Sequence, residues 1–272
     1  MSVENYIDLY ADSPSDLIEL LRMLYPSNPN KATDKTTFFN GHINATVHAW
    51  DNRTIEWMKE DYDVNVNCCL SFQYFSDSDC NSASELLYVM KHLVRMLNCD
   101  LLYQPNGDSP VMVRRSGILL FDEYFDRYFG EGASDSLREQ NRINITADLS
   151  MEDIMKRCEE KFGDDFNWWM LPEEKREASF VSELKLELGD DDPFFDGRVY
   201  AIYKCDANDD MLFQSVRKDG TELWRIYHLT YSHCREIEGF PRRWDFESGQ
   251  KAAEYIINQY VEENESCGLK LS

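Results

Sequence analysis

Apolar and polar residues alternate strictly from Val64 to Tyr74, which predicts a strand at the centre of the first half of the chain. Successive side chains of a strand point to opposite faces. The even-numbered residues are all apolar, so we expect them to pack in a core. The odd-numbered face is small, uncharged and polar, and is either a docking surface or covered by the second half. Its members are Asn65, Asn67, Cys69, Ser71 and Gln73.

Other patterns in the first half predict helices and short strands around this one. Apolar residues three or four positions apart predict helices at 16–24, 54–60 and 84–97, the last of them deeply buried. Alternation and turn residues predict strands at 38–50, 100–104, 111–115 and 118–122. Residues 131–145 hold few large apolar side chains, so we interpret them as a linker.

The second half repeats this mixture without repeating the sequence. Ser150 should cap a helix over 151–162, and apolar spacing predicts a closing helix over 247–263. Alternation predicts strands over 179–188 and 199–203. A hairpin over 211–231 should turn at Asp219 and Gly220 and place Val216 opposite Leu223.

Together these patterns predict an α+β fold made of two halves, each with a mainly antiparallel sheet flanked by helices. We expect an N-terminal domain over residues 1–130, the linker over 131–145, and a C-terminal domain over 146–272.

The charge of the chain narrows the classes of partner. Acidic residues number 51 against 28 basic ones, a net charge of −23 over 272 residues. Such a field repels nucleic acids and anionic membranes and attracts basic proteins, so we expect neither nucleic-acid nor membrane binding. No run approaches the roughly 18 apolar residues of a membrane span. The eight cysteines form no C-x-x-C pair and no signal peptide precedes them, which indicates a cytoplasmic protein with reduced thiols.

Candidate metal ligands lack the spacing of known sites. The group His228, His233, Cys234 and Cys205 matches no structural zinc pattern. Asp206, Asn208 and Asp210 begin like a calcium loop, but Met211 and Arg217 stand where that loop needs glycine and glutamate. We therefore expect no metal and no cofactor.

No motif for nucleophilic catalysis or phosphate binding occurs, so we expect a protein that is not an enzyme. One alternative is an enzyme of unknown reaction with a site at the junction of the two halves, formed by His228, His233 and Cys234 or by carboxylates. Another alternative is a scaffold or interaction module.

Aromatic residues beside acidic loops suggest a protein-binding surface, because tryptophan is enriched at interface centres. The loop tryptophans and the acidic loops of the second half are the candidates. The predicted partner-binding residues are Trp169, Asp190, Asp191, Asp192, Asp209, Asp210 and Trp244.

Residues 39–123 resemble the Sit-type family of bacterial immunity proteins, the polymorphic-toxin immunity proteins. The features that carry the resemblance are Gly41-His42-Ile43 leading a strand, Met58 to Tyr62, Ser71 to Tyr74, the helix with Leu86 and Met90, the turn Asn106 to Asp108, and the strand Gly117 to Asp122.

The resemblance implies a non-enzymatic cytoplasmic protein of bacterial competition that binds a cognate toxin, as the immunity partner in a toxin–antitoxin type of pair. It transfers no catalytic residue. Because many toxins that attack nucleic acids are basic, an acidic toxin inhibitor would gain association rate and specificity from the opposite charge.

Overall fold

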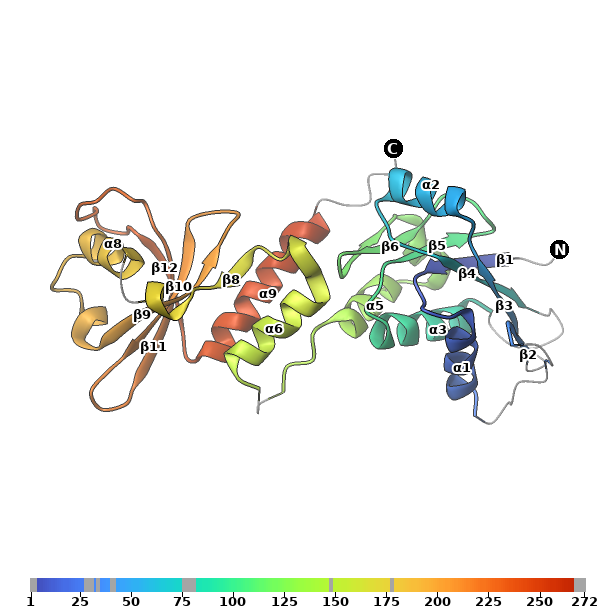
Figure 1. Ribbon diagram of the computed structural model, residues 1–272, viewed down its shortest axis with the longest axis horizontal. Coiled ribbons are helices and arrows are strands. Elements are labelled where there is room, and N and C mark those ends of the chain that lie inside the picture. Colours follow the sequence, from blue (N-terminus) through green and yellow to red (C-terminus); the bar gives the residue numbers. More distant parts are fainter. Residues whose placement is uncertain are drawn as a thin grey trace. The chain divides into compact units, whose positions relative to one another are not determined.

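The computed structural model describes residues 4–26, 32, 35–39, 43–74, 82–146, 149–176 and 179–266 (Figure 1). The chain forms two compact units. Unit 1 contains Met1–Ile143 and Val261–Ser272, and unit 2 contains Asn144–Tyr260. Each unit combines one antiparallel sheet with helices, so the α+β class is confirmed. None of the described helices combines the length and the apolar character needed to cross a membrane.

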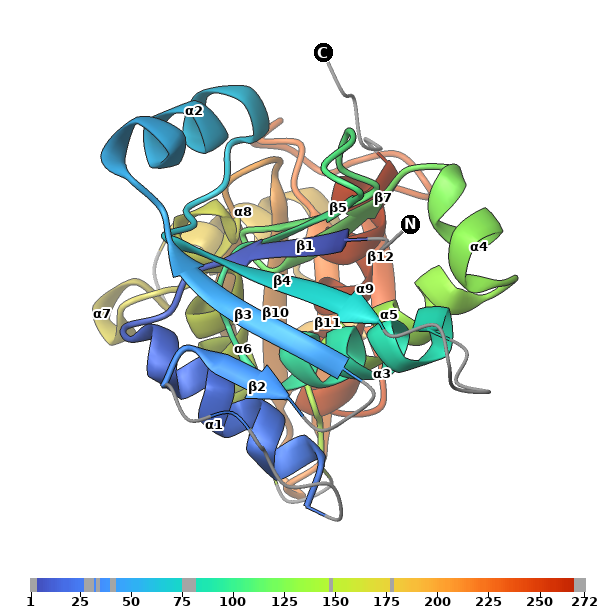
Figure 2. The same ribbon diagram turned by 90° about the vertical axis from the view of Figure 1, so that its right-hand side faces the viewer.

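The sheet of unit 1 has the strand order β2-β3-β4-β1-β5-β6-β7, and each neighbouring pair is antiparallel (Figure 2). Its strands are β1 (Glu4–Leu9), β2 (Thr37–Phe39), β3 (Ile43–Ala49), β4 (Cys68–Tyr74), β5 (Leu101–Pro105), β6 (Met112–Arg115) and β7 (Ile118–Phe121). The helices are α1 (Pro14–Leu24), α2 (Asn52–Tyr62), α3 (Ser82–Met96), α4 (Tyr124–Phe129) and α5 (Ala133–Asn141).

The central strand β1 is absent from the sequence prediction. It lies between β4 and β5. Asn5 on one face and Asp8 on the other are both buried polar residues, so neither face of the strand is open to solvent at these positions. Asn5 Oδ1 accepts a hydrogen bond of 2.8 Å from the Tyr103 hydroxyl. Polar residues at buried positions interrupt the apolar alternation, and so the pattern that identifies a strand is missing here.

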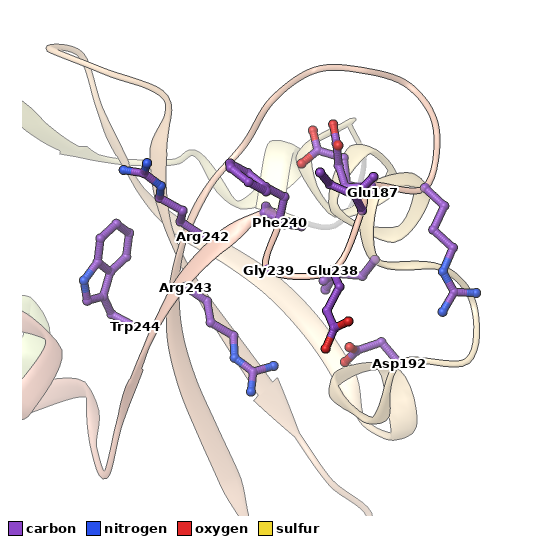
Figure 3. A pocket seen from close by; sticks show the side chains of 13 residues that line it. Glu187, Asp192, Glu238, Gly239, Phe240, Arg242, Arg243 and Trp244 are labelled. Atoms are coloured by element: carbon purple, nitrogen blue, oxygen red, sulfur yellow. The ribbon is translucent and has the colours of Figure 1, made fainter.

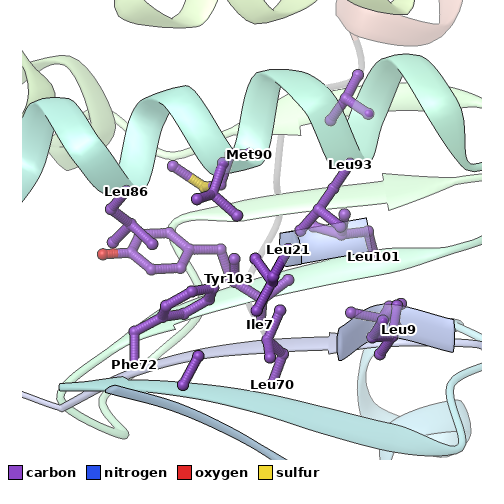
Figure 4. Close-up of a cluster of buried hydrophobic side chains, with 14 of the residues drawn as sticks. Ile7, Leu9, Leu21, Leu70, Phe72, Leu86, Met90, Leu93, Leu101 and Tyr103 are labelled. Carbon is purple, nitrogen blue, oxygen red and sulfur yellow. The ribbon is translucent and has the colours of Figure 1, made fainter. Parts of the chain in front are cut away.

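The even-numbered face of β4 is confirmed as core at Leu70 and Phe72. Figure 4 shows both beneath Leu86 and Met90 of α3. Residues 64–67, in contrast, lie outside the strand, and the same face does not continue through them.

Val64 and Val66 instead join a second cluster with Met58 of α2, on the opposite side of the sheet. The Asn67 amide explains the break, because it exchanges two hydrogen bonds with the backbone of Ala11, at 2.9 and 2.8 Å. The observed strand β4 is therefore shorter than the alternating pattern of Val64 to Tyr74 predicts.

Two buried polar side chains of unit 1 donate hydrogen bonds to backbone carbonyls. Arg114 of β6 is buried and donates to the carbonyls of Val94 and Cys99, at 2.8 and 2.7 Å, which closes the C-terminal end of α3. Asn141 of α5 donates to the carbonyl of Gly117 at 2.7 Å. The predicted linker over 131–145 therefore contains a helix of unit 1, with Leu137 fully buried.

The sheet of unit 2 has the order β12-β11-β10-β9-β8 and is antiparallel throughout. Its strands are β8 (Trp168–Met170), β9 (Arg198–Cys205), β10 (Asp210–Val216), β11 (Glu222–His228) and β12 (Arg242–Phe246). The helices are α6 (Met151–Phe162), α7 (Glu173–Arg176), α8 (Ser179–Leu188) and α9 (Gly249–Ser266), with the 3-10 turns η1 (Gly163–Asp165) and η2 (Pro193–Asp196). The end of α9, from Val261 on, belongs to unit 1.

Helices cover both faces of this sheet. Leu184 of α8 and Phe194 of η2 pack on one face, against Phe213 and Tyr227. On the other face Tyr255 of α9 contacts the ring of Trp244, with the ring centroids 6.2 Å apart. The bounds of α6 and its Ser150 cap agree with the prediction.

The register of the predicted hairpin is wrong by one residue. Val216 lies opposite Glu222, and Ser215 lies opposite Leu223. The backbone bond from Arg217 to Thr221 closes a loop of three residues, with Gly220 at φ 85°. A glycine in the left-handed region at the end of such a loop replaces the predicted two-residue turn and shifts every pair by one.

Asp8 makes unit 1 less stable as the pH rises. It is fully buried, and its Oδ1 accepts a bond of 2.9 Å from the Trp50 indole. Its Oδ2 has no hydrogen-bond partner in the part of the chain that the structure describes. Burial raises the pKa of Asp8 to about 6, against the opposing hydrogen bonds of Cys69 and Trp50. The folded chain thus binds this proton more tightly than the unfolded chain, so stability falls as pH rises from about 4 to about 6.

We expect Asp8→Asn to remove this dependence, because the amide stays neutral at every pH. The free energy of unfolding of the wild type relative to that of the variant should fall by roughly 2–3 kcal/mol across that window. Urea unfolding followed by circular dichroism between pH 4.5 and 7.5 measures both, with the exposed Asp61→Asn of α2 as control. Parallel pH profiles for wild type and Asp8→Asn would refute the assignment.

Candidate functional site

The segment over 179–188 forms helix α8, so the predicted strand is wrong. The buried residues of this helix are Glu183, Leu184 and Glu187, whereas Leu186 is 50% exposed. Those positions have helical spacing, but two of them hold glutamate. The apolar residues alone therefore show the period of a strand, although the buried face is that of a helix.

Glu187 is buried because it binds backbone groups of the segment that follows β11. Its Oε1 accepts from the N–H groups of Thr230 and Tyr231, at 2.9 and 2.7 Å. Its own carbonyl accepts the N–H of Glu236 at 2.9 Å. Burial raises the pKa of Glu187, and the hydrogen bonds from Tyr231 and Thr230 oppose that shift.

Glu183 lies one turn earlier on α8 and binds the same segment. It accepts the backbone N–H of His233 at 3.0 Å, and its other oxygen lies 2.6 Å from Nδ1 of the His233 ring. Two carboxylates spaced i, i+4 on one helix face thus hold one loop.

We call residues 229–241 the anchored loop. Tyr231 and His233 both have positive φ, 52° and 57°, which non-glycine residues adopt at a cost. The hydrogen bonds to Glu183 and Glu187 offset that cost, and so the loop has a defined conformation outside any helix or strand.

A groove of about 880 Å³ runs between the anchored loop, the end of α8 and the start of η2 (Figure 3). Strand β12 forms one of its walls and is the outer strand of the sheet in the described part of unit 2. The groove is lined by Glu187, Leu188, Asp192 and residues 235–244.

The groove combines exposed apolar side chains with charges. Ile237 is 72% exposed and Phe240 is 41% exposed. The guanidinium of Arg242 lies 5.9 Å from the centroid of the Phe240 ring, and Arg243 Nε lies 3.4 Å from an oxygen of Asp245. In Figure 3 the side chains of Asp192 and Arg243 point into the same part of the groove. Apolar contacts with a charged rim are the composition of a protein interface.

Several of the predicted partner-binding residues belong to this groove. Asp192 and Trp244 line it, and Asp191 forms an ion pair of 3.1 Å with Arg235 of its wall. Asp190 is exposed beside them and pairs with Lys185 at 3.0 Å.

The other three predicted residues lie elsewhere in unit 2. Trp169 stands on β8, at the opposite edge of the sheet from β12, and donates to Asp206 at 2.7 Å. Asp209 is exposed, but Asp210 is buried and lies 2.8 Å from the ring of His228. Both predicted loop tryptophans are strand residues, since Trp244 lies on β12.

The candidate metal ligands do not converge. His228 and His233 pair with different carboxylates, Cys205 is buried and Cys234 is exposed. Asn208 accepts the N–H of Asp210 at 2.8 Å, as expected for a turn. Among the described residues no three histidine, cysteine or carboxylate side chains meet as a metal site. Cys80 and Cys267 lie outside the described residues.

The sequence prediction missed Glu183, Glu187, Ile237 and Phe240. The i, i+4 spacing of the two glutamates was the available signal, but acidic pairs are frequent in a chain of this charge.

We expect Glu187→Ala to release the anchored loop. The substitution leaves the amides of Thr230 and Tyr231 without their acceptor, which should lower stability by about 2–3 kcal/mol and speed their hydrogen exchange. Glu187→Gln should lose less stability, because the amide oxygen of glutamine still accepts hydrogen bonds from these N–H groups. Leu186→Ala, one position away on the exposed face of α8, is the control. Unchanged exchange at both amides in Glu187→Ala would contradict the anchoring role.

Comparisons of the chain with protein-family models, with curated proteins and with solved structures give no match. The resemblance to the Sit-type immunity family therefore stays a prediction that rests on residues 39–123. Gly41 and His42, which lead its first strand, lie outside the described residues.

Proposed function

We propose that this chain is a non-enzymatic acidic inhibitor of the immunity type, which binds a basic protein toxin and neutralises it. The groove of unit 2 and its acidic rim form the docking surface. This proposal joins the net charge of −23 and the resemblance in unit 1 to the geometry of the anchored loop.

The observation that carries the proposal is a loop whose first half is held by hydrogen bonds to α8 while its second half presents apolar side chains to solvent. Two buried carboxylates bind the backbone of Thr230, Tyr231 and His233 in the first half of the loop, and Ile237 and Phe240 are exposed in its second half. A preorganised surface loses less conformational entropy on binding than a flexible one. Exposed apolar side chains on a fixed loop are therefore suited to enter pockets of a partner.

The net charge of −23 favours a basic partner, although the groove also carries Arg235, Arg242 and Arg243 among its acidic residues. Asp190, Asp191 and Glu238 are exposed at or next to the rim of the groove. Carboxylates around an interface raise the association rate with a cationic protein and disfavour acidic competitors. The expected complex therefore forms faster at low salt than at high salt.

The test begins with toxin genes beside the gene for this chain. Expression of the neighbouring toxin alone should stop growth, and coexpression of this chain should restore it. The purified proteins should form a stable complex in titration calorimetry. A neighbouring toxin that this chain neither binds nor neutralises would refute the proposal.

Removal of the rim charges should slow association. We expect the triple variant Asp190→Asn, Asp191→Asn and Glu238→Gln to lower the association rate constant by about tenfold at low salt, with a weaker salt dependence. The control is Glu56→Gln, Glu60→Gln and Asp61→Asn on the exposed side of α2. Both triples remove three negative charges, so equal losses in stopped-flow rates would mean that only net charge matters.

A further inference from the structure

The strands β1, β4 and β3 lie side by side in the sheet of unit 1 (Figure 2). On the side opposite the α3 core, their register forms a regular grid of mostly polar residues. The register places Gln73 of β4 between Glu4 of β1 and Asn44 of β3. In the next row Ser71 lies between Tyr6 and Thr46, and in the third row Cys69 lies between Asp8 and His48. This is the odd-numbered face of β4 with its neighbours on both sides.

The centre of the grid is a hollow because Ser71 is smaller than the residues around it. The hollow has a volume of about 260 Å³ and is lined by side chains of all three strands. Its lining consists of Glu4, Tyr6, Asn44, Thr46, His48, Ser71 and Gln73. In this polar surface a short side chain at the middle position leaves room for part of a ligand.

Hydrogen bonds hold the rim in place. The Tyr6 hydroxyl and the Gln73 amide both donate to the carboxylate of Glu4, the latter at 2.7 Å. The Asn44 amide lies 3.4 Å from the Gln73 oxygen. The Ser71 hydroxyl donates to the carbonyl of Thr46 at 3.2 Å and lies 3.4 Å from Nε2 of His48. A rim fixed by its own contacts is preorganised for a ligand of matching chemistry.

The free binding capacity of this rim is mostly that of acceptors. Hydrogen bonds from Tyr6 and Gln73 lower the pKa of Glu4, so its carboxylate stays ionised at neutral pH, and each oxygen keeps further lone pairs. The hydrogen bond to Glu4, followed by burial, raises the pKa of Tyr6 to about 12, so the hydroxyl keeps its proton. Among the described residues, neither lysine nor arginine belongs to the lining.

We propose that this hollow binds the guanidinium group of an arginine side chain presented by a partner protein. A guanidinium is planar, always charged and carries five N–H donors, which suits a carboxylate and several neutral acceptors spread over three adjacent strands. An anion is disfavoured by Glu4, and a second carboxyl on this face, that of Asp8, lies in the third row. The site does not depend on the groove of unit 2 and goes beyond the function proposed for it.

Paired probes that differ only in charge test the proposal on the full chain. The peptide acetyl-Gly-Arg-Gly-amide carries a guanidinium, and the same peptide with citrulline carries a neutral urea group of the same shape. Titration of each into ¹⁵N-labelled protein is followed through the side-chain amide signals of Asn44 and Gln73. We expect saturable shifts with the arginine peptide and at least about tenfold weaker binding of the citrulline peptide, since the charge-assisted bonds are lost.

Substitutions locate the binding. Glu4→Gln should weaken the affinity for the arginine peptide by about tenfold. The control Glu60→Gln, at an exposed glutamate of α2, should leave that affinity unchanged. Ser71→Val fills the hollow with a residue suited to a strand and should abolish the shifts, in a protein whose remaining spectrum is that of the wild type.

Three results would overturn the proposal: equal binding of the two peptides, equal binding in Glu4→Gln, or shifts that persist in Ser71→Val. Each of these concerns unit 1 only. Loss of toxin neutralisation, in contrast, is measured with the groove variants of unit 2, so failure of one proposal is distinguishable from failure of the other.

Discussion

Buried charged side chains that bind backbone groups hold the irregular segments of both units in place. Arg114 donates to two carbonyls at the end of α3, and Glu183 and Glu187 accept the N–H groups of the anchored loop. Burial of a charge is costly unless hydrogen bonds replace its hydration. In each case the backbone supplies them. The C-terminal end of α3 in unit 1 therefore depends on a buried charged side chain, and so does a wall of the groove in unit 2. Neither the apolar core of unit 1 nor that of unit 2 requires these charged groups.

The same arrangement explains why a long exposed loop is suited to recognition. Residues 232–235 and 237–240 are exposed, and a segment of that kind would ordinarily fluctuate. Its first half is instead fixed by α8, and Thr230 binds Glu236 through a side-chain bond of 2.6 Å. The apolar groups of Ile237 and Phe240 are thereby placed in a defined position relative to β12. Binding energy gained from such groups is not lost again in ordering the loop.

The sequence predicted the elements whose buried face is apolar and missed those whose buried face is polar. Helix α6, with Met151, Ile154, Met155 and Cys158 inside, was predicted with its cap. Strand β1 was missed because Asn5 and Asp8 are buried on a central strand, and α8 was taken for a strand because glutamates occupy its inner face. The hairpin was found, but its register depends on the left-handed Gly220 and the loop length it permits. Hydrophobic periodicity contains no information about a polar group that is buried for its hydrogen bonds.

The candidate sites were also predictable from the sequence only in part. Alternation in β4 identified Ser71 and Gln73 as one polar face, and the structure places both in the lining of the hollow. Cys69 shares that face but is buried, between Asp8 and His48, so the accessible part of the face begins one row further along. The residues that surround Ser71 are set by the pairing of β4 with β1 and β3. Strand β1 pairs with β4 although α1, β2, β3 and α2 lie between them in the sequence. A face can be predicted from one strand, but a hollow is a property of three strands in register, because its depth is set by the size difference between neighbours that only pairing brings together.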